Sequence, residues 1–297
     1  MKIASYWWGG RRQVGLVDDA GASVTPLACA GTDAPVARHG ALALVEQLVD
    51  GKPLPRANGT RLPLATIRLA PPLTPRRNVF CVGVNYRAHA VEFARSGFGG
   101  QSAPPPQDRP EAPVIFSKVP ECLIGCGDPI VLPGSLSTAI DYESELVVVI
   151  GRGGRGIPAR EAMAHVFGYT VFNDVTARDL QRRHRQWLIG KSLDGFGPIG
   201  PWIVTADEVD GNDTRVRGWV NGELRQDART TDLIFTVPDL IAAISAGITL
   251  QAGDLIATGT PAGVGIGFDP PRFLAAGDTV RIEIDGIGVL ENPVRDP

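Results

Sequence analysis

The sequence predicts an α+β fold that is rich in β-strands and carries a small β-rich unit at its N-terminus. Glycine and proline are frequent, with 36 and 25 copies in 297 residues, which predicts many turns and many short strands. Runs of β-branched residues, such as residues 146–150, predict buried strands. The length exceeds that of a typical single domain, so we expect two domains or one large domain with an appendage.

The composition narrows the classes of function. Hydrophobic residues make up 43% of the chain, charged residues 21%, and the formal net charge is −3. These values are typical of a globular protein and provide no basic surface for nucleic acid or membrane lipid. No apolar stretch reaches transmembrane length, and the first residues lack the apolar core of a signal peptide. We therefore expect a cytoplasmic protein whose partners are small molecules or other copies of itself.

The N-terminal segment predicts a small sheet and one helix. Alternating patterns predict strands at residues 2–8, 13–17 and 22–27. Apolar spacing in residues 40–50 predicts an amphipathic helix. The proline-rich residues 70–75 are the expected boundary between a non-catalytic domain, 1–70, and a catalytic domain, 71–297.

The next pattern pairs a histidine with a carboxylate. Residues 78–84 predict a buried strand, and a helix is expected to follow from Asn85. On that helix His89 and Glu92 share one face, so the carboxylate can orient the imidazole. A surface ion pair is the plainer interpretation, but the position after a core strand favours a catalytic pair.

Residues 94–112 lack periodicity and are dense in glycine and proline. Two interpretations stay open for them, an active-site lid and a passive surface insertion. The strand expected at residues 113–120 contains Lys118, which we expect to be a surface or rim charge.

An acidic strand follows. Asp141, Glu143 and Glu145 run directly into the apolar residues 146–150, and alternation along one strand puts all three carboxylates on one face. Neighbours on that face lie about 6.5 to 7 Å apart, a gap that a hard cation with oxygen ligands can bridge. A solvated edge strand is the alternative. The valine run argues against it, because buried carboxylates without a cation are costly or become protonated.

Asp174 ends the next expected strand, residues 165–174, and Thr176 is the expected cap of a helix over residues 177–184. Asp174 can supply a third oxygen ligand or help to cap that helix. Residues 190–201 are dense in glycine and proline, so their backbone can approach a ligand closely. Lys191 begins that stretch, and taken alone it predicts only a solvent-exposed charge.

The remaining segments predict mostly β-structure. Asn221 and Gly222 predict a tight hairpin, and residues 239–248 predict a helix. A strand leads into the glycine-rich residues 258–265, which lack the pattern of a nucleotide-binding loop. The last two strands are expected at residues 278–284 and 287–290.

Five motifs in this order resemble the fumarylacetoacetate hydrolase family over about residues 76 to 295, and more closely its bacterial acylpyruvase and 2-hydroxyhepta-2,4-diene-1,7-dioate isomerase members. The motifs are Asn85-Tyr86-x-x-His89-x-x-Glu92, Asp141-Tyr142-Glu143-x-Glu145-Leu146, Asn173-Asp174-Val175-Thr176-Ala177-Arg178-Asp179, Lys191-Ser192-Leu193-Asp194 and Thr258-Gly259-Thr260-Pro261-x-Gly263-Val264-Gly265. Together they are highly specific for the family and only loosely informative about the substrate.

The resemblance implies a mixed β-rich fold of the sandwich or roll type and a homodimer with one Mg²⁺ or Mn²⁺ per subunit. It assigns the metal to Glu143, Glu145 and Asp174. The implied catalytic residues are His89, Glu92 and Lys191, and the implied substrate-binding residues are Arg178, Gln181 and Thr260. Asp141 has no part in the family pattern, so we expect it to support the ligands without touching the metal.

Members of the family act on small 2-oxo acids, and their reactions develop an enolate that a divalent cation stabilises. Our leading hypothesis is hydrolysis of a C–C bond in acylpyruvates or related 2,4-dioxo acids, with water activated by His89 and Glu92. The alternative is an isomerase or decarboxylase of 2-oxo or 2-hydroxy dienedioates or of oxaloacetate, in the catabolism of aromatic compounds. A third, different hypothesis is a binding protein that keeps the metal only for stability.

Overall fold

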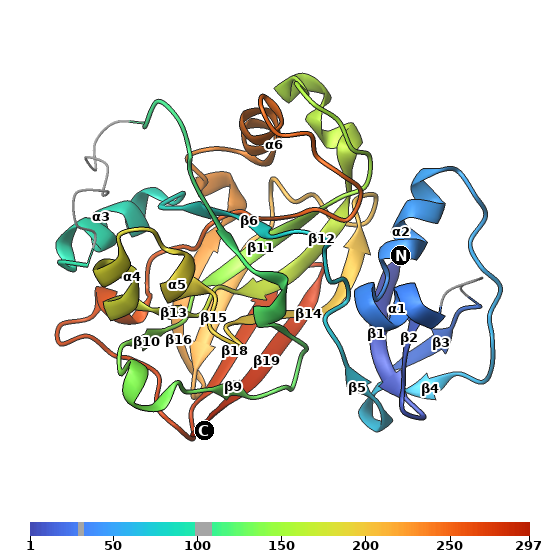
Figure 1. Cartoon of the computed structure of the whole chain (residues 1–297), viewed down its shortest axis with the longest axis horizontal. Helices are drawn as coiled ribbons and strands as arrows, with labels where there is room; N and C mark the ends of the chain where they lie inside the picture. The colour runs from blue at the N-terminus through green and yellow to red at the C-terminus, as the bar shows by residue number, and fades with distance from the viewer. Residues whose placement is uncertain (29–32, 99–108) are drawn as a thin grey trace.

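The structure, a computed structural model, describes residues 1–28, 33–98 and 109–297. Within these residues the largest sheet has twelve strands (Figure 1). They are β1 (Lys2–Trp8), β2 (Arg11–Val17), β3 (Ser23–Pro26), β4 (Leu62–Pro63), β5 (Arg68–Leu69), β6 (Val79–Gly83), β7 (Val114–Lys118), β8 (Leu123–Ile124), β11 (Ser144–Ile150), β12 (Val166–Asn173), β14 (Gly197–Thr205) and β17 (Leu255–Ala257). The order across the sheet is β4-β3-β2-β1-β14-β12-β11-β17-β6-β7, with β5 paired to β1 and β8 to β14.

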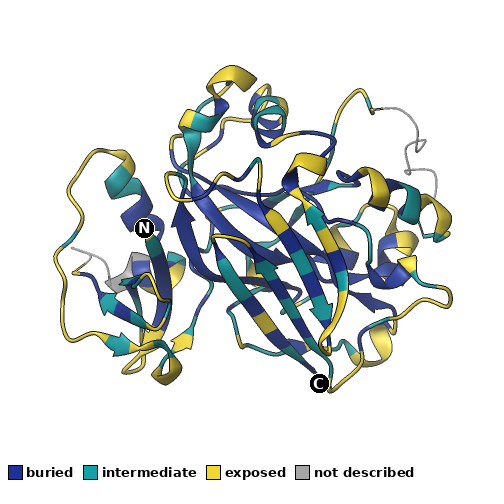
Figure 2. Cartoon of the chain, turned by 180° about the vertical axis from the view of Figure 1, so that it is seen from behind, coloured by how far each residue is buried: buried dark blue, intermediate teal, exposed yellow. Residues whose placement is uncertain are grey.

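A second sheet packs against the first. Its strands, in spatial order, are β16 (Glu223–Arg229), β15 (Arg215–Val220), β18 (Thr279–Ile284), β19 (Gly288–Arg295) and β9 (Ile130–Val131). One hydrophobic cluster joins Val148 of the large sheet to Val216 and Ile282 of the small one. Buried residues therefore line the strands of both sheets (Figure 2). The expected β-rich α+β fold is confirmed.

Helices pack around the two sheets, and Leu42 and Val45 of one of them form a hydrophobic cluster with Ile203 of the large sheet. They are α1 (Asp33–His39), α2 (Leu42–Val49), α3 (Arg87–Arg95), α4 (Arg178–His184), α5 (Leu188–Lys191) and α6 (Val237–Ser245). The helices expected at residues 40–50, after Asn85, at 177–184 and at 239–248 are confirmed as α2, α3, α4 and α6. Figure 1 shows α3, α4 and α5 gathered at one end of the molecule. None of the described helices is both long and apolar enough to cross a membrane.

The N-terminal strands continue the central sheet. Lys2 and Ile3 of β1 pair with Val204 and Ile203 of β14 in antiparallel register. Arg12 ties the unit to the chain that leaves it, because its guanidinium donates to the carbonyl of Arg38 and the hydroxyl of Thr74. The described part of residues 1–70 thus lies beside the rest of the fold, with its strands at one edge of the large sheet (Figure 1). Their status as a separate domain stays a prediction.

Two segments differ from expectation. The single strand expected through Asp141 and residues 144–150 is broken at Tyr142 and Glu143, so Asp141 belongs to β10 (Ile140–Asp141), which pairs with β13 (Thr176–Ala177). Residues 190–201 divide between α5 and β14, and the strand is buried along its whole length between β1 and β12. Burial on both faces outweighs the turn preference of its glycines and prolines.

Candidate active site

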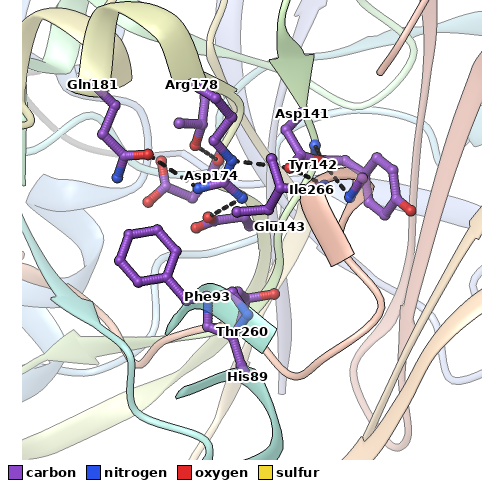
Figure 3. A network of polar contacts seen from close by, with 12 residues as sticks. His89, Phe93, Asp141, Tyr142, Glu143, Asp174, Arg178, Gln181, Thr260 and Ile266 are labelled. Carbon is purple, nitrogen blue, oxygen red and sulfur yellow. Dashed lines mark hydrogen bonds and ion pairs between the residues drawn. The ribbon is translucent and has the colours of Figure 1, made fainter. Parts of the chain in front are cut away.

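Three carboxylates meet where β11 and β12 lie side by side. Antiparallel pairing sets Ser144 opposite Asn173, and just beyond that pair the N–H of Asp174 donates to the carbonyl of Glu143 at 2.9 Å. One oxygen from each of the three lies within 4.8 Å of the others, and all three side chains are buried. Figure 3 shows Glu143 and Asp174 turned toward the same space. The strand pairing, which the sequence does not specify, is what brings Asp174 to the two glutamates.

Three buried cations surround these carboxylates. Lys191 donates to Glu143 Oε2 at 2.7 Å and to Asp174 Oδ2 at 2.9 Å. Lys118 donates to Asp174 Oδ1 at 2.7 Å. The Nη2 atom of Arg178 lies 2.7 Å from Glu143 Oε1. Only Glu145 lacks a cationic side-chain partner among the described residues; its Oε2 accepts the N–H of Gly259 at 2.9 Å.

Burial and charge divide the two glutamates electrostatically. Burial opposes ionisation of Glu143, but the charges of Lys191 and Arg178 outweigh it and lower its pKa to about 2. Glu145 is held differently. Burial, and next the negative charges of Asp174 and Glu143, raise its pKa well above the ordinary value. Lys191 loses solvation, yet the same two carboxylates keep its pKa raised. The site thus pairs one firmly ionised carboxylate with one that favours a proton.

Asp141 lies outside the carboxylate cluster. Its Oδ2 accepts Arg178 Nε at 2.9 Å and the N–H of Ile266 at 3.1 Å, and its Oδ1 accepts the N–H of Gly265 at 2.6 Å. The expected common face with the two glutamates is wrong, because the strand breaks at Tyr142. The structure therefore makes Asp141 an anchor for Arg178, which in turn reaches Glu143.

Lys118 corrects a second expectation. The predicted surface charge is fully buried, and its ammonium group binds Asp174 Oδ1 and the carbonyl of Val175 at 3.1 Å. The signal was present in the alternation of β7, which puts Lys118 on the same face as Phe116. A charge on an apolar strand face next to a carboxylate site predicts a buried partner, and sequence reasoning missed it.

His89 and Glu92 form a pair on α3, in which His89 is buried and Glu92 is partly buried. Their Nδ1 and Oε2 atoms lie 3.0 Å apart, and His89 is only 3% exposed. The other oxygen of Glu92 accepts the N–H of Gly263 at 2.8 Å. Glu92 is therefore fixed at both oxygens and can hold the imidazole in one orientation. Figure 3 shows His89 entering the network from the side opposite α4.

The glycine-rich loop after β17 binds carboxylates through its backbone. The N–H groups of Gly259, Gly263 and Gly265 donate to Glu145, Glu92 and Asp141, respectively. Gly259 and Gly263 have φ values of +101° and +103°, a conformation that other residues rarely adopt. The glycine-rich residues 258–265, which lack the pattern of a nucleotide-binding loop, thus position the carboxylates of this site.

One narrow pocket contains most of the predicted site residues. It is lined by His89, Glu143, Glu145, Arg178, Gln181, Lys191 and Thr260, together with an apolar wall. Trp187 forms the centre of that wall, with edge contacts to Phe93 and Phe116 at ring-centre distances of 6.1 and 5.1 Å. These three aromatic residues had no local signal in the sequence, because they come from α3, β7 and the α4–α5 connection.

The residues fit a divalent cation. Among the described residues of this site, four buried carboxylates, including that of Asp141, face three buried cations, which leaves one formal negative charge without compensation. Glu145 also keeps its Oε1 without a partner among the described residues. Carboxylate oxygens are the ligands that Mg²⁺ and Mn²⁺ prefer. Glu143, Glu145 and Asp174 would hold such an ion, as predicted.

Fold and site together define an α+β protein whose buried acidic pocket, next to a histidine–glutamate pair, has the features of an enzyme active site. The chain belongs to the fumarylacetoacetate hydrolase family, since the family profile described as "Fumarylacetoacetate (FAA) hydrolase C-terminal" matches residues 78–295.

Named relatives support the same assignment. The chain is 47% identical over 233 residues to oxaloacetate tautomerase YisK of Bacillus subtilis, covering 78% of this chain and 74% of that protein. Among solved structures it is similar to the fumarylacetoacetate hydrolase of Exiguobacterium antarcticum, with 40% identity, a TM-score of 0.82 and full coverage of both chains. It is also similar to maleylpyruvate hydrolase from Sphingobium sp. SYK-6 in complex with manganese(II) and pyruvate. Here identity is 31%, the TM-score 0.76 and coverage 100% and 99%.

Proposed function

We propose that this protein is a divalent-metal-dependent isomerase that interconverts the enol and keto forms of oxaloacetate. The observation that carries the proposal is the 47% identity to an oxaloacetate tautomerase on a chain whose pocket is lined by a buried histidine that is paired with a carboxylate. The identity favours the isomerase alternative over the hydrolysis of acylpyruvates, which was our leading hypothesis from the sequence.

The reaction moves one proton between C3 and the oxygen on C2 of the substrate. His89, oriented by Glu92, is suited to take the proton from C3 in one direction and to return it in the other. Lys191 carries a positive charge at the buried end of the pocket, where it attracts the carboxylate next to C2. A cation bound by Glu143, Glu145 and Asp174 would stabilise negative charge on the C2 oxygen.

The direct test follows the ultraviolet absorbance of freshly dissolved enol-oxaloacetate. We expect the protein with Mg²⁺ or Mn²⁺ to speed the loss of the enol above the spontaneous rate, and His89→Gln to abolish most of the gain. Arg76→Gln, a change in an exposed pair with Glu46, is the matched control and leaves the rate unchanged. A wild-type rate no faster than that of buffer with metal would contradict the proposal.

Hydrolysis is the second candidate, and the similarity to maleylpyruvate hydrolase favours it. It requires the same enolate stabilisation and adds an attacking water, for which His89 is again the expected base. Release of pyruvate from maleylpyruvate or an acylpyruvate, at a rate above that of enol loss, would favour this candidate. We also propose that the protein is a cytoplasmic homodimer. Light scattering of the purified protein tests whether it is a dimer.

A further inference from the structure

One side chain near the pocket comes from the small sheet, and the family pattern assigns no role to it. Gln226 on β16 is fully buried and lies between β11 and the glycine-rich loop. Its Oε1 accepts the N–H of Ser144 at 3.0 Å. Its Nε2 donates to the carbonyl of Pro261 at 2.7 Å and to Thr260 Oγ1 at 2.8 Å.

These contacts fix the direction of the amide. A backbone N–H can only donate and a backbone carbonyl can only accept, so Ser144 and Pro261 together determine which end of Gln226 is oxygen and which is nitrogen. A flipped amide would set its nitrogen against the Ser144 N–H and its oxygen against the Pro261 carbonyl, and neither pair can form a hydrogen bond. The nitrogen of Gln226 therefore points at Thr260 with a hydrogen.

The hydroxyl of Thr260 is fixed in turn. Because its oxygen accepts from Gln226, its own hydrogen has to go to another acceptor. Thr260 lines the pocket, and within the described residues its hydroxyl hydrogen has no acceptor. A buried donor without a partner costs free energy, which a ligand with acceptor oxygens removes.

Gln181 shows the same arrangement on the α4 side of the pocket. Its Oε1 accepts Arg178 Nη1 at 3.2 Å, which leaves the amide nitrogen as the end available to a ligand. Thr260 and Gln181 thus offer neutral donors to the pocket from two different elements. A ligand with several acceptor oxygens, such as a 2-oxo acid, suits this pattern, and one with hydroxyl donors there does not.

We propose that Gln226 is a positioning residue, which turns the Thr260 hydroxyl into a hydrogen-bond donor for an oxygen of the bound acid. The inference rests on the proposed function in one respect, that the pocket binds a small 2-oxo acid. It assigns Gln226 no contact with the substrate. Its effect on binding passes through Thr260.

The test is a double-mutant cycle on binding of oxalate, a planar dianion that resembles the enolate of a 2-oxo acid. Oxalate is titrated calorimetrically into the Mn²⁺-loaded protein. We expect Gln226→Met and Thr260→Val each to raise the dissociation constant about tenfold, the effect of about one hydrogen bond to a charged acceptor. Gln226→Met on the Thr260→Val background should add less than about twofold, because the coupled hydroxyl is already gone.

Two further variants test whether weaker binding results only from a destabilised fold. Thr230→Val removes a buried hydroxyl that accepts the N–H of Thr214 at 2.9 Å near the same hairpin, so it loosens the hairpin without touching Thr260. It should lower the melting temperature and leave the oxalate constant unchanged. Gln226→Asn keeps an amide but its shorter side chain does not reach Thr260. It should raise the oxalate dissociation constant about tenfold, so it replaces Gln226→Met in the test if that variant does not fold.

If Gln226→Met weakens oxalate binding by the same factor in the wild type and in the Thr260→Val variant, the inference is overturned. A wild-type protein that binds no oxalate would also overturn it. Failure of the proposed function shows differently. A protein that binds oxalate with the predicted coupling, but leaves the enol of oxaloacetate untouched, removes the tautomerase proposal and retains the role of Gln226.

Discussion

Replacing Lys118 by methionine tests the electrostatic account of the site. The ammonium group has no exposed surface, and it binds the buried Asp174 at 2.7 Å and the carbonyl of Val175 at 3.1 Å. Methionine nearly preserves the volume of the side chain and removes the charge. The change therefore isolates the buried ion pair from packing.

The expected loss of stability follows from what remains. Removing one partner of a buried ion pair typically costs about 3 to 5 kcal/mol. Asp174 keeps Lys191 on its other oxygen, so its charge is still compensated in part. We therefore expect the lower end of the range, a free energy of unfolding reduced by about 3 kcal/mol in metal-free protein. One more uncompensated negative charge should also tighten Mn²⁺ binding, so added metal should restore part of the loss.

Urea unfolding in the presence of a chelator, repeated with saturating Mn²⁺, measures both effects. Lys52→Met is the matched control, because Lys52 pairs with Asp50 at 3.1 Å while both side chains are 62% exposed. An exposed pair contributes about 0 to 1 kcal/mol. If the two variants lose equal stability, or if Mn²⁺ binds more weakly to Lys118→Met, the reasoning about the buried cluster is refuted.

Three more predictions concern the site. His89→Gln should lower kcat for enol loss about 10²- to 10⁴-fold and leave calorimetric Mn²⁺ affinity unchanged; weakened metal binding would argue against a role as base. Glu145 has a raised pKa, so metal-free protein should lose stability as pH rises above the ordinary glutamate value of 4.5. Glu143, with its pKa lowered to about 2, contributes stability that is lost only as pH falls from 4.5 toward 2, below the pH range of the unfolding experiment. Urea unfolding between pH 5 and 8 measures how stability depends on pH. Saturating Mg²⁺ or Glu145→Gln should make that dependence weaker. The same dependence with chelator and with saturating Mg²⁺ would contradict the prediction. Asp141→Asn should destabilise the protein by about 2 kcal/mol because a buried partner of Arg178 loses its charge; an unchanged urea midpoint would refute the anchoring role.

Local patterns were sufficient for most of the elements near the site. The β-branched run at residues 146–150 predicts β11, and Asn221 with Gly222 predicts the hairpin, where both residues have positive φ. The spacing of His89 and Glu92 predicts their pairing because both lie on one helix. In each case the residues that decide the structure are neighbours in the chain.

Long-range pairing decided what the sequence did not predict. Lys118 is buried because its ammonium group binds Asp174 and the carbonyl of Val175, which lie more than 50 residues away in the chain. Asp141 lies away from Glu143 and Glu145 because Arg178 binds one of its oxygens and the N–H of Gly265 binds the other. Gln226 reaches Thr260 only because the two sheets pack face to face. Each of these side chains is defined by a partner more than 30 residues away.

The most direct test of a metal-dependent active site is a titration of metal-free protein with Mn²⁺ in which bound metal and the rate of enol loss are measured in the same samples. We expect the rate to rise in proportion to the occupancy of one site per chain, and Asp174→Asn to weaken Mn²⁺ binding and shift the rate curve by the same factor. Full activity in the presence of a chelator, or a rate that ignores the occupancy of the site, would contradict this expectation.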